Sequence, residues 1–143
     1  MEAADMLRYS WLCGLLVVLL FVGCKRNNPK FEKTVTVRGT VVLASGSPLT
    51  GGLITFHPKD LTKGEARGTI GNDGRFEMGT YGKSDGVMLG TYTVTVERMV
   101  YDKNGNIRPA NLPIPNKYTS ADTSDLTVEI NDEGEQDLKL ALR

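Results

Sequence analysis

The chain has 143 residues, with 17 basic and 17 acidic side chains and no net formal charge at neutral pH. It contains no run of five or more Lys or Arg residues, so it lacks the charge pattern typical of nucleic-acid-binding proteins. Its two cysteines, Cys13 and Cys24, both lie near the N-terminus, which excludes disulfides, thiol redox chemistry and a thiolate zinc site from the rest of the chain.

An apolar stretch over residues 11–22 comes first, and it spans twelve residues. A helix that crosses a bilayer needs about 20 apolar residues, whereas the apolar core of a secretory signal has about 7–15. The pattern therefore predicts a signal peptide over residues 1–23. Because Glu2 and Asp5 are unusual in the positive start of such a signal, we expect Met6 to be the initiator.

The stretch ends in Leu20-Phe21-Val22-Gly23-Cys24, which resembles the bacterial lipobox, with Phe21 where Leu is usual. The resemblance implies cleavage between Gly23 and Cys24, followed by a diacylglyceryl group on the Cys24 sulfur. We therefore expect the protein to work in a bacterial cell envelope, anchored in a membrane by this lipid. The alternative is a small apolar cysteine at the end of a buried helix.

Polar residues follow the cysteine, and Pro29 lies among them, which predicts a short lipidated tether over residues 24–33. Lys25 and Arg26 are expected to contact anionic headgroups, at about 1 kcal/mol each near a charged surface. Lys25 does not resemble an inner-membrane retention signal, so an outer-membrane destination is compatible with it.

From residue 34 onward apolar and polar residues alternate with a period of two, and the apolar ones are expected to face a core. Tyr92, Val94 and Val96 show this alternation most clearly. Asp73-Gly74 is a strong hairpin signal. The pattern predicts seven strands, over residues 34–43, 53–58, 65–70, 75–80, 90–99, 125–130 and 136–142.

Short strands joined by frequent turns, with no helix expected after Cys24, indicate the all-β class. We expect one domain over residues 34–143, a β-sandwich of seven to eight antiparallel strands with Greek-key connections. The exception is residues 101–124, where three prolines make regular sheet improbable. This segment is expected to be a long loop.

Four segments of this domain resemble the carboxypeptidase regulatory-like domain, a transthyretin-like β-sandwich. They are residues 37–41 with Gly39 in mid-strand, 48–56, 72–76 and 90–96; Asp85-Gly86 and residues 114–118 are similar to a subgroup in short bacterial lipoproteins. The resemblance covers about residues 35–142. It implies an accessory role, because in its namesake enzymes the domain accompanies a zinc peptidase without performing the hydrolysis.

Candidate chemistry is sparse, and we expect no catalytic site, no metal and no cofactor. His57 is the single histidine, too few for a two-histidine zinc site, and it has no nucleophile elbow to serve; we expect it at a strand end, partly exposed. Residues 102–106 place oxygens at alternate positions as a calcium loop begins, but Ile107 and Pro113 stand where that loop needs Gly and Glu. An ordinary Asn-Gly turn explains the same residues.

Aromatic and apolar residues beside loops remain as candidate contacts for a partner. The alternative is that the tyrosines plug the open ends of the sandwich. We expect a non-enzymatic binding or structural module that meets an envelope protein or polysaccharide; a carbohydrate-binding module and an accessory subunit of a separate hydrolase are the alternatives. The candidate contact residues are Tyr81, Met88, Tyr101, Ile107 and Tyr118.

Overall fold

The computed structural model describes residues 31–133 and 136–143, so the predicted signal peptide, Gly23 and Cys24 lie outside the described residues. Among these, no helix is long and apolar enough to span a membrane. The strands are β1 (Thr34–Val35), β2 (Val37–Leu43), β3 (Leu53–Pro58), β4 (Ala66–Thr69), β5 (Arg75–Gly79), β6 (Val87–Met88), β7 (Gly90–Glu97), β8 (Met99–Tyr101), β9 (Ile107–Pro109), β10 (Thr127–Ile130) and β11 (Gln136–Leu142). A 3-10 helix, η2 (Asn116–Thr119), follows β9.

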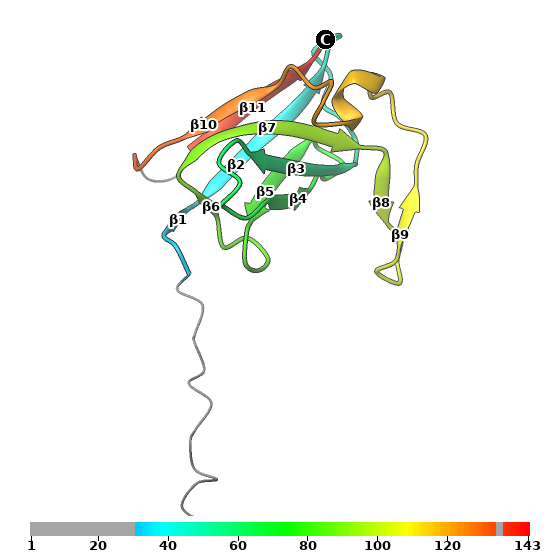
Figure 1. Cartoon of the computed structure of the whole chain (residues 1–143). Coiled ribbons are helices and arrows are strands. Elements are labelled where there is room, and N and C mark those ends of the chain that lie inside the picture. The colour runs from blue at the N-terminus through cyan, green and yellow to red at the C-terminus, as the bar shows by residue number, and fades with distance from the viewer. Residues whose placement is uncertain (1–30, 134–135) are drawn as a thin grey trace, which may run out of the picture. The chain divides into compact units, whose positions relative to one another are not determined.

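The main sheet has the strand order β10-β7-β3-β4-β5-β2-β11. Strand β5 pairs with β2 over Arg75–Glu77 and with β4 through Met78 and Gly79, so it joins two layers. Figure 1 shows β7, β3 and β4 lying across β2 and β11. The expected all-β sandwich is confirmed. One pairing differs from the antiparallel expectation, since β11 runs parallel to β2, which the long intervening chain permits.

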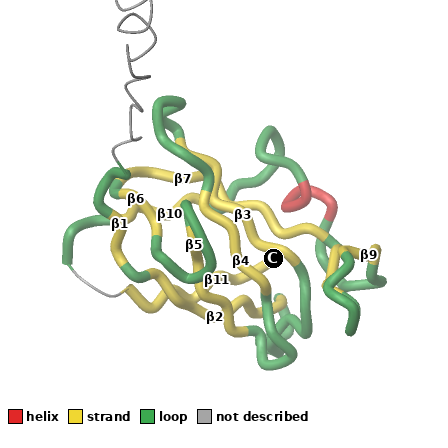
Figure 2. Tube along the Cα trace, turned by 90° about the horizontal axis from the view of Figure 1, so that it is seen from below, coloured by secondary structure: helices red, strands yellow, loops and turns green. Residues whose placement is uncertain are grey.

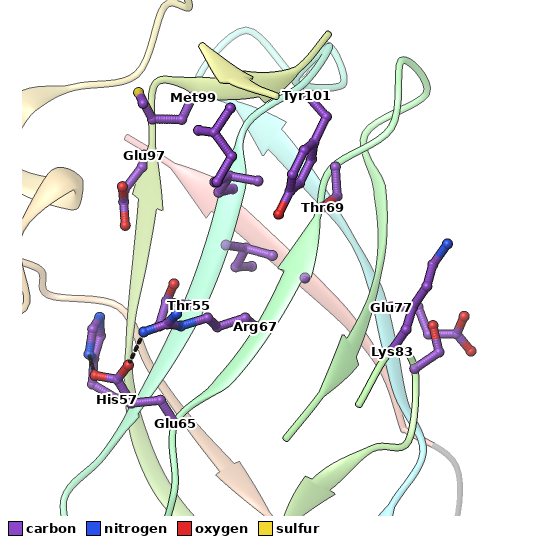
Figure 3. A pocket seen from close by; sticks show the side chains of 15 residues that line it. Thr55, His57, Glu65, Arg67, Thr69, Glu77, Lys83, Glu97, Met99 and Tyr101 are labelled. Carbon is purple, nitrogen blue, oxygen red and sulfur yellow. Dashed lines mark hydrogen bonds and ion pairs between the residues drawn. The ribbon is translucent and has the colours of Figure 1, made fainter. Parts of the chain in front are cut away.

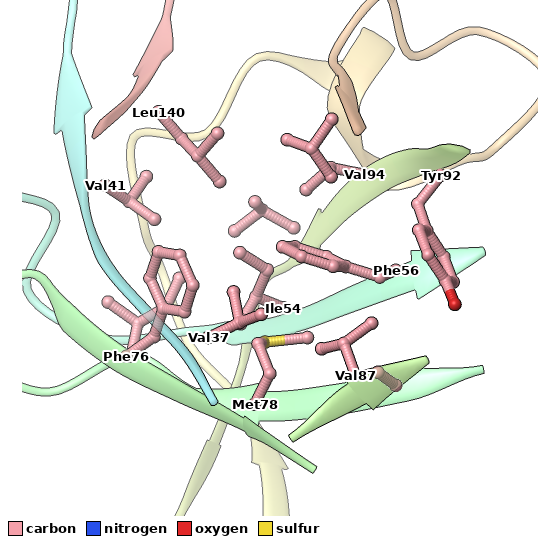
Figure 4. Packing of buried hydrophobic residues seen from close by; sticks show 14 of the residues in the cluster. Val37, Val41, Ile54, Phe56, Phe76, Met78, Val87, Tyr92, Val94 and Leu140 are labelled. Atoms are coloured by element: carbon pink, nitrogen blue, oxygen red, sulfur yellow. The ribbon is translucent and has the colours of Figure 1, made fainter. Parts of the chain in front are cut away.

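The inward side chains of both layers form a single apolar core (Figure 4). Tyr92, Val94 and Val96 are fully buried, as the alternation predicts. The Tyr92 hydroxyl donates a hydrogen bond to the Met88 carbonyl at 2.8 Å, so this buried polar atom is satisfied. Burial of such side chains stabilises the fold by about 1.5–3 kcal/mol each.

A close approach of strands explains Gly39 in the middle of β2. A Cβ atom at this position would lie 2.3 Å from the Leu138 carbonyl oxygen and 2.7 Å from Cζ of Phe76. Both distances are far inside van der Waals contact, so no other residue fits without moving the backbone.

The predicted hairpin at Asp73-Gly74 is also confirmed, between β4 and β5. Gly74 has φ +79° and donates to the Gly71 carbonyl at 3.0 Å, and Gly71 donates to the Arg75 carbonyl at 2.8 Å. Glycine adopts this left-handed conformation without the steric cost that a Cβ imposes.

Three features depart from the expected strands. The predicted first strand is divided into β1 and β2, because β1 pairs with β6, outside the main sheet. The short strand β6 was not expected. Residues 101–124 were expected to lack regular sheet, and this is wrong for their first part, where β8 and β9 pair as a hairpin.

The prolines explain why this hairpin is short. Pro109 ends β9 opposite Met99, where its missing N–H costs least, and Pro113 and Pro115 follow in the irregular segment. Arg98 holds that segment in place: its guanidinium donates to the carbonyls of Leu112 and Ile114 and to Asn116 Oδ1.

Tyr118, in η2, plugs the core and is 2 % exposed. Its hydroxyl accepts a hydrogen bond from the backbone N of Arg143 at 3.0 Å and donates to the Arg143 carbonyl at 3.1 Å. The expectation that Tyr118 contacts a partner is therefore wrong, and the alternative of a plug is correct for this residue.

Candidate functional site

The outer face of β7, β3 and β4 carries polar side chains, because the residues between the core positions point away from the core. A groove of about 1130 Å³ lies on this face. Figure 3 shows its lining, with Tyr101 and Met99 gathered at one end and His57 and Glu65 at another. It is larger than a second depression of about 540 Å³, which Arg38, Thr40 and Arg75 help to line.

The β8–β9 hairpin forms the apolar end of the groove. Tyr101 and Ile107 are directly opposite each other in its register, and each is 50 % exposed. Met99 and Leu53 line the same space. Two residues predicted as partner contacts are thus brought together as one cross-strand pair, whose apolar surface lines the groove and not the core.

The polar end is organised around His57, on β3. Its Nδ1 lies 2.8 Å from Glu65 Oε1 and its Nε2 lies 2.9 Å from Thr95 Oγ1. A carboxylate only accepts hydrogen bonds, so Nδ1 carries the proton, and in the neutral ring Nε2 accepts the Thr95 hydroxyl proton. The His57 side chain is 29 % exposed near a strand end, as expected.

A hydroxyl, an imidazole and a carboxylate in this order resemble the relay of a nucleophilic hydrolase. Thr95 is, however, 2 % exposed and does not line the groove. His57 and Glu65 line the groove, whereas the Thr95 hydroxyl is buried behind the imidazole. The chain of hydrogen bonds fixes the orientation of His57 on the sheet.

Arg67 completes the polar end. Its Nη2 donates to Glu65 Oε2 at 2.9 Å, while its side chain remains 75 % exposed. The hydrogen bond from Arg67, helped by that from His57, holds the pKa of Glu65 below its ordinary value of 4.5. Glu65 is thus ionised at neutral pH, and the guanidinium is left on the surface, able to donate to a ligand.

A third side of the groove is charged. Lys83 and Ser84 line it from the segment after β5, and Glu77 lines it from β5 itself. Hydrogen bonds from Ser84 and Arg38 lower the pKa of Glu77. The groove therefore offers acceptors and donors along its length, and one apolar wall.

The other two predicted contact residues, Tyr81 and Met88, lie outside the groove and touch each other. The Tyr81 hydroxyl is 3.3 Å from Met88 Sδ. Tyr81 is 43 % exposed, whereas Met88 is 3 % exposed. The prediction of Met88 as a partner contact is therefore wrong, because its side chain packs under Tyr81 at the β1–β6 pair.

Residues 102–106, which match only the beginning of a calcium loop, form a turn in the β8–β9 hairpin. Asp102 Oδ1 accepts hydrogen bonds from the backbone N of Asn104 at 2.8 Å and of Asn106 at 3.0 Å, and Oδ2 accepts from Arg108 Nε at 2.5 Å. The hydrogen bond from Arg108 is the main reason that the Asp102 pKa is lowered. In the part of the chain that the structure describes, no three metal-ligating side chains come together.

Sequence reasoning missed most of the groove. The lining includes four residues that were not predicted: Thr55, Arg67, Lys83 and Glu97. In the sequence each looks like an ordinary solvent-facing residue of a strand or turn. No local signal marks them. The period-two alternation could have placed Thr55, Arg67 and Glu97 on one outer face, but not the hairpin that encloses that face.

Comparisons with known proteins add little. No family model matches the chain, and no curated protein matches it. Two solved structures are similar in fold. The major pilin subunit of Bacillus cereus is 14% identical with a TM-score of 0.44, over 78% of this chain and 30% of that one. A 9R-lipoxygenase from Cyanothece is 12% identical with a TM-score of 0.41, over 87% of this chain and 19% of that one.

This chain thus spans less than a third of the length of either protein. Matches this distant carry no conclusion about activity or binding. The resemblance to carboxypeptidase regulatory-like domains stays a prediction. What the structure shows is the fold, an all-β sandwich with a groove on the outer face of one layer.

Proposed function

We propose that this protein is a lipid-anchored component of a bacterial cell envelope, whose β-sandwich binds a partner in the outer-face groove without performing chemistry on it. The anchor is the diacylglyceryl group expected on Cys24. The observation that carries the binding function is the groove of about 1130 Å³, with Tyr101 and Ile107 exposed on its wall. An apolar wall beside convergent polar groups is the usual composition of a binding site.

A non-enzymatic role is supported by the state of the polar groups. The hydroxyl that His57 contacts belongs to Thr95, which is 2 % exposed and does not line the groove. A nucleophile has to meet its substrate, and this hydroxyl is covered. The groups that remain accessible, above all the Arg67 guanidinium, are donors suited to holding a ligand.

A carbohydrate is the partner that one specific feature favours. Tyr101 presents a half-exposed ring, and the adjoining lining supplies Thr69 and Glu97 as hydrogen-bonding groups. A flat ring beside directional polar groups matches the apolar face and the hydroxyls of a sugar. We therefore propose a polysaccharide of the envelope as the leading ligand class.

The anchor is tested by replacing Cys24. The Cys24→Ala chain is expected to leave the membrane fraction, whereas Cys13→Ala, a matched change within the apolar stretch, is expected to leave partitioning unchanged. The readout is detergent phase partitioning, with the mass of the mature chain. Unchanged partitioning of Cys24→Ala would contradict the anchor.

The groove is tested by cosedimentation with purified cell-wall polysaccharide. Tyr101→Ala is expected to weaken binding by about thirtyfold, since loss of an aromatic contact that anchors a ligand costs roughly 2 kcal/mol. Leu61→Ala, which removes another exposed apolar side chain outside the groove, is the matched control and should bind normally. Equal binding of both variants would overturn the assignment of the groove.

A further inference from the structure

Exposed apolar side chains are distributed unevenly over the described residues. Five large ones are exposed: Phe31, Leu61, Tyr81, Tyr101 and Ile107. The last two belong to the groove. The other three need a separate explanation, since their exposure serves neither the core nor the groove.

Phe31 and Tyr81 form one aromatic contact at the start of the compact unit. Their ring centroids are 4.6 Å apart, edge to face, and the backbone N of Glu32 donates to the Tyr81 hydroxyl at 2.9 Å. Phe31 is nevertheless 69 % exposed. The contact holds both rings in place and leaves the Phe31 ring largely in water.

The loop that carries Leu61 packs against the same place. Lys63 Nζ donates to the Leu89 carbonyl. A Cβ on Gly64 would lie 3.5 Å from Cε of Met88, the residue on which Tyr81 also packs. We call this region, made of Phe31, residues 59–64 and residues 80–86, the N-terminal pole. It adjoins the β1–β6 pair (Figure 2), since the Thr34 hydroxyl of β1 donates to the Asp85 carbonyl. Leu61 is 92 % exposed there.

The chain length ties this pole to the anchor. Phe31 is the seventh residue after Cys24, and an extended chain spans at most about 3.5 Å per residue, or roughly 25 Å over these seven steps. A lipid on Cys24 therefore keeps Phe31 within that distance of the bilayer. No other part of the compact unit is tied so closely to the membrane by the covalent chain.

We propose that the N-terminal pole docks on the lipid surface itself, with Leu61, Phe31 and Tyr81 inserted at the boundary between headgroups and acyl chains. This inference rests on the proposed lipid anchor and adds to it a defined membrane-facing side of the domain. Aromatic side chains favour the membrane interface, where a ring meets apolar chains and a hydroxyl meets headgroups.

Charge is a secondary contribution. The loops of the pole carry Lys59, Lys63 and Lys83 but also Asp60 and Asp85, so the basic excess is small. Docking of this kind depends mainly on buried apolar area. It is therefore expected to occur on zwitterionic vesicles and to weaken little when salt is added.

The test uses the processed, lipidated chain. Its single tryptophan, Trp11, lies in the predicted signal peptide, so the mature protein has none. Leu61→Trp then places one reporter at the pole, and Ile107→Trp places the matched control on the hairpin. Both positions are exposed, so neither change disturbs the core.

Each variant is incorporated into phosphatidylcholine vesicles, with or without brominated acyl chains. Leu61→Trp is expected to show a blue-shifted emission and several-fold stronger quenching by the brominated lipid than Ile107→Trp. Equal quenching of the two reporters, strong or weak, in a chain that floats with the vesicles would overturn the docking alone. A chain that keeps its signal peptide by mass, or fails to float, would overturn the anchor and the docking with it.

Discussion

The inner and outer faces of β7, β3 and β4 belong to the same strands but serve different purposes. On the inner face, Ile54, Phe56 and Val94 are fully buried and pack against the opposite layer. On the outer face, His57 and Arg67 are held by hydrogen bonds in a groove. Stability should therefore depend on the inner face and ligand binding on the outer face, with little overlap between them.

The largest expected effect is on the inner face. Phe56→Ala removes a fully buried ring that packs on Phe76 and Tyr92, and should lower the free energy of unfolding by about 3–5 kcal/mol. Leu53→Ala, a partly exposed position on the outer face of the same strand, is the control, with a loss of about 1 kcal/mol or less. Urea denaturation measures both, and similar losses would contradict the division of faces.

Gly39→Val should have the next largest effect. The added side chain meets the Leu138 carbonyl and the Phe76 ring, and such overpacking costs about 1–3 kcal/mol. Thr40→Val, on the neighbouring and partly exposed position of β2, should change the melting temperature little. A Gly39→Val chain with an unchanged melting temperature would contradict the prediction, because it would show that β2 and β11 move apart at little cost.

Ionisation of Tyr92 should make the stability of the fold depend on pH in the alkaline range. Burial raises the pKa of Tyr92 to about 12 from its ordinary 10.0. Between pH 10 and 12 the folded chain thus keeps the phenol proton that the unfolded chain loses. The contribution of the protonated Tyr92 to the free energy of unfolding is therefore fully present below pH 10. It falls as the pH rises toward 12, by at most about 1.4 kcal/mol per pH unit. Tyr92→Phe should remove this component of the slope, as measured by denaturation between pH 9 and 12. Parallel curves would contradict it.

The smallest effect is expected on the outer face, from Glu65. The pKa of Glu65 in the folded chain is lowered, mainly by the hydrogen bond from Arg67. The ionised carboxylate therefore contributes fully to the free energy of unfolding above pH 4.5, and this contribution is lost as the pH falls through the pKa of the folded state. Because the side chain is 41 % exposed, the loss is about 0.2–1 kcal/mol. Glu65→Gln should be less sensitive to acid than the original, and Glu129→Gln, at an exposed position of β10, is the control. Identical acid profiles of Glu65→Gln and the original chain would contradict the role of this carboxylate.

Local pattern was sufficient for the strands of the main sheet, but not for β6 or the β8–β9 hairpin. All seven predicted strands have counterparts, because a buried face imposes a period of two on any strand, and Tyr92, Val94 and Val96 show it without reference to the rest of the chain. The hairpin at Gly74 was predictable for the same reason: its turn residues carry their own conformational preference.

The tyrosines show where local pattern fails. Tyr101 ends β8 and Tyr118 lies in η2, both in a proline-containing region, yet Tyr101 is 50 % exposed and Tyr118 is 2 % exposed. The difference comes from Arg143, whose backbone meets the Tyr118 hydroxyl from 25 residues away in the sequence. No neighbouring residue carries that information.

The sequence by itself determined the strands of the main sheet and their inward residues, since each depends on a short run of residues. Lipid attachment at Cys24 also follows from a short run, and it stays a prediction. The tertiary structure alone decided the parallel pairing of β11 with β2, the β8–β9 wall and the contact of His57 with Glu65 and Thr95. The physical reason is that periodicity reflects local backbone geometry, whereas a groove requires side chains from distant segments to meet.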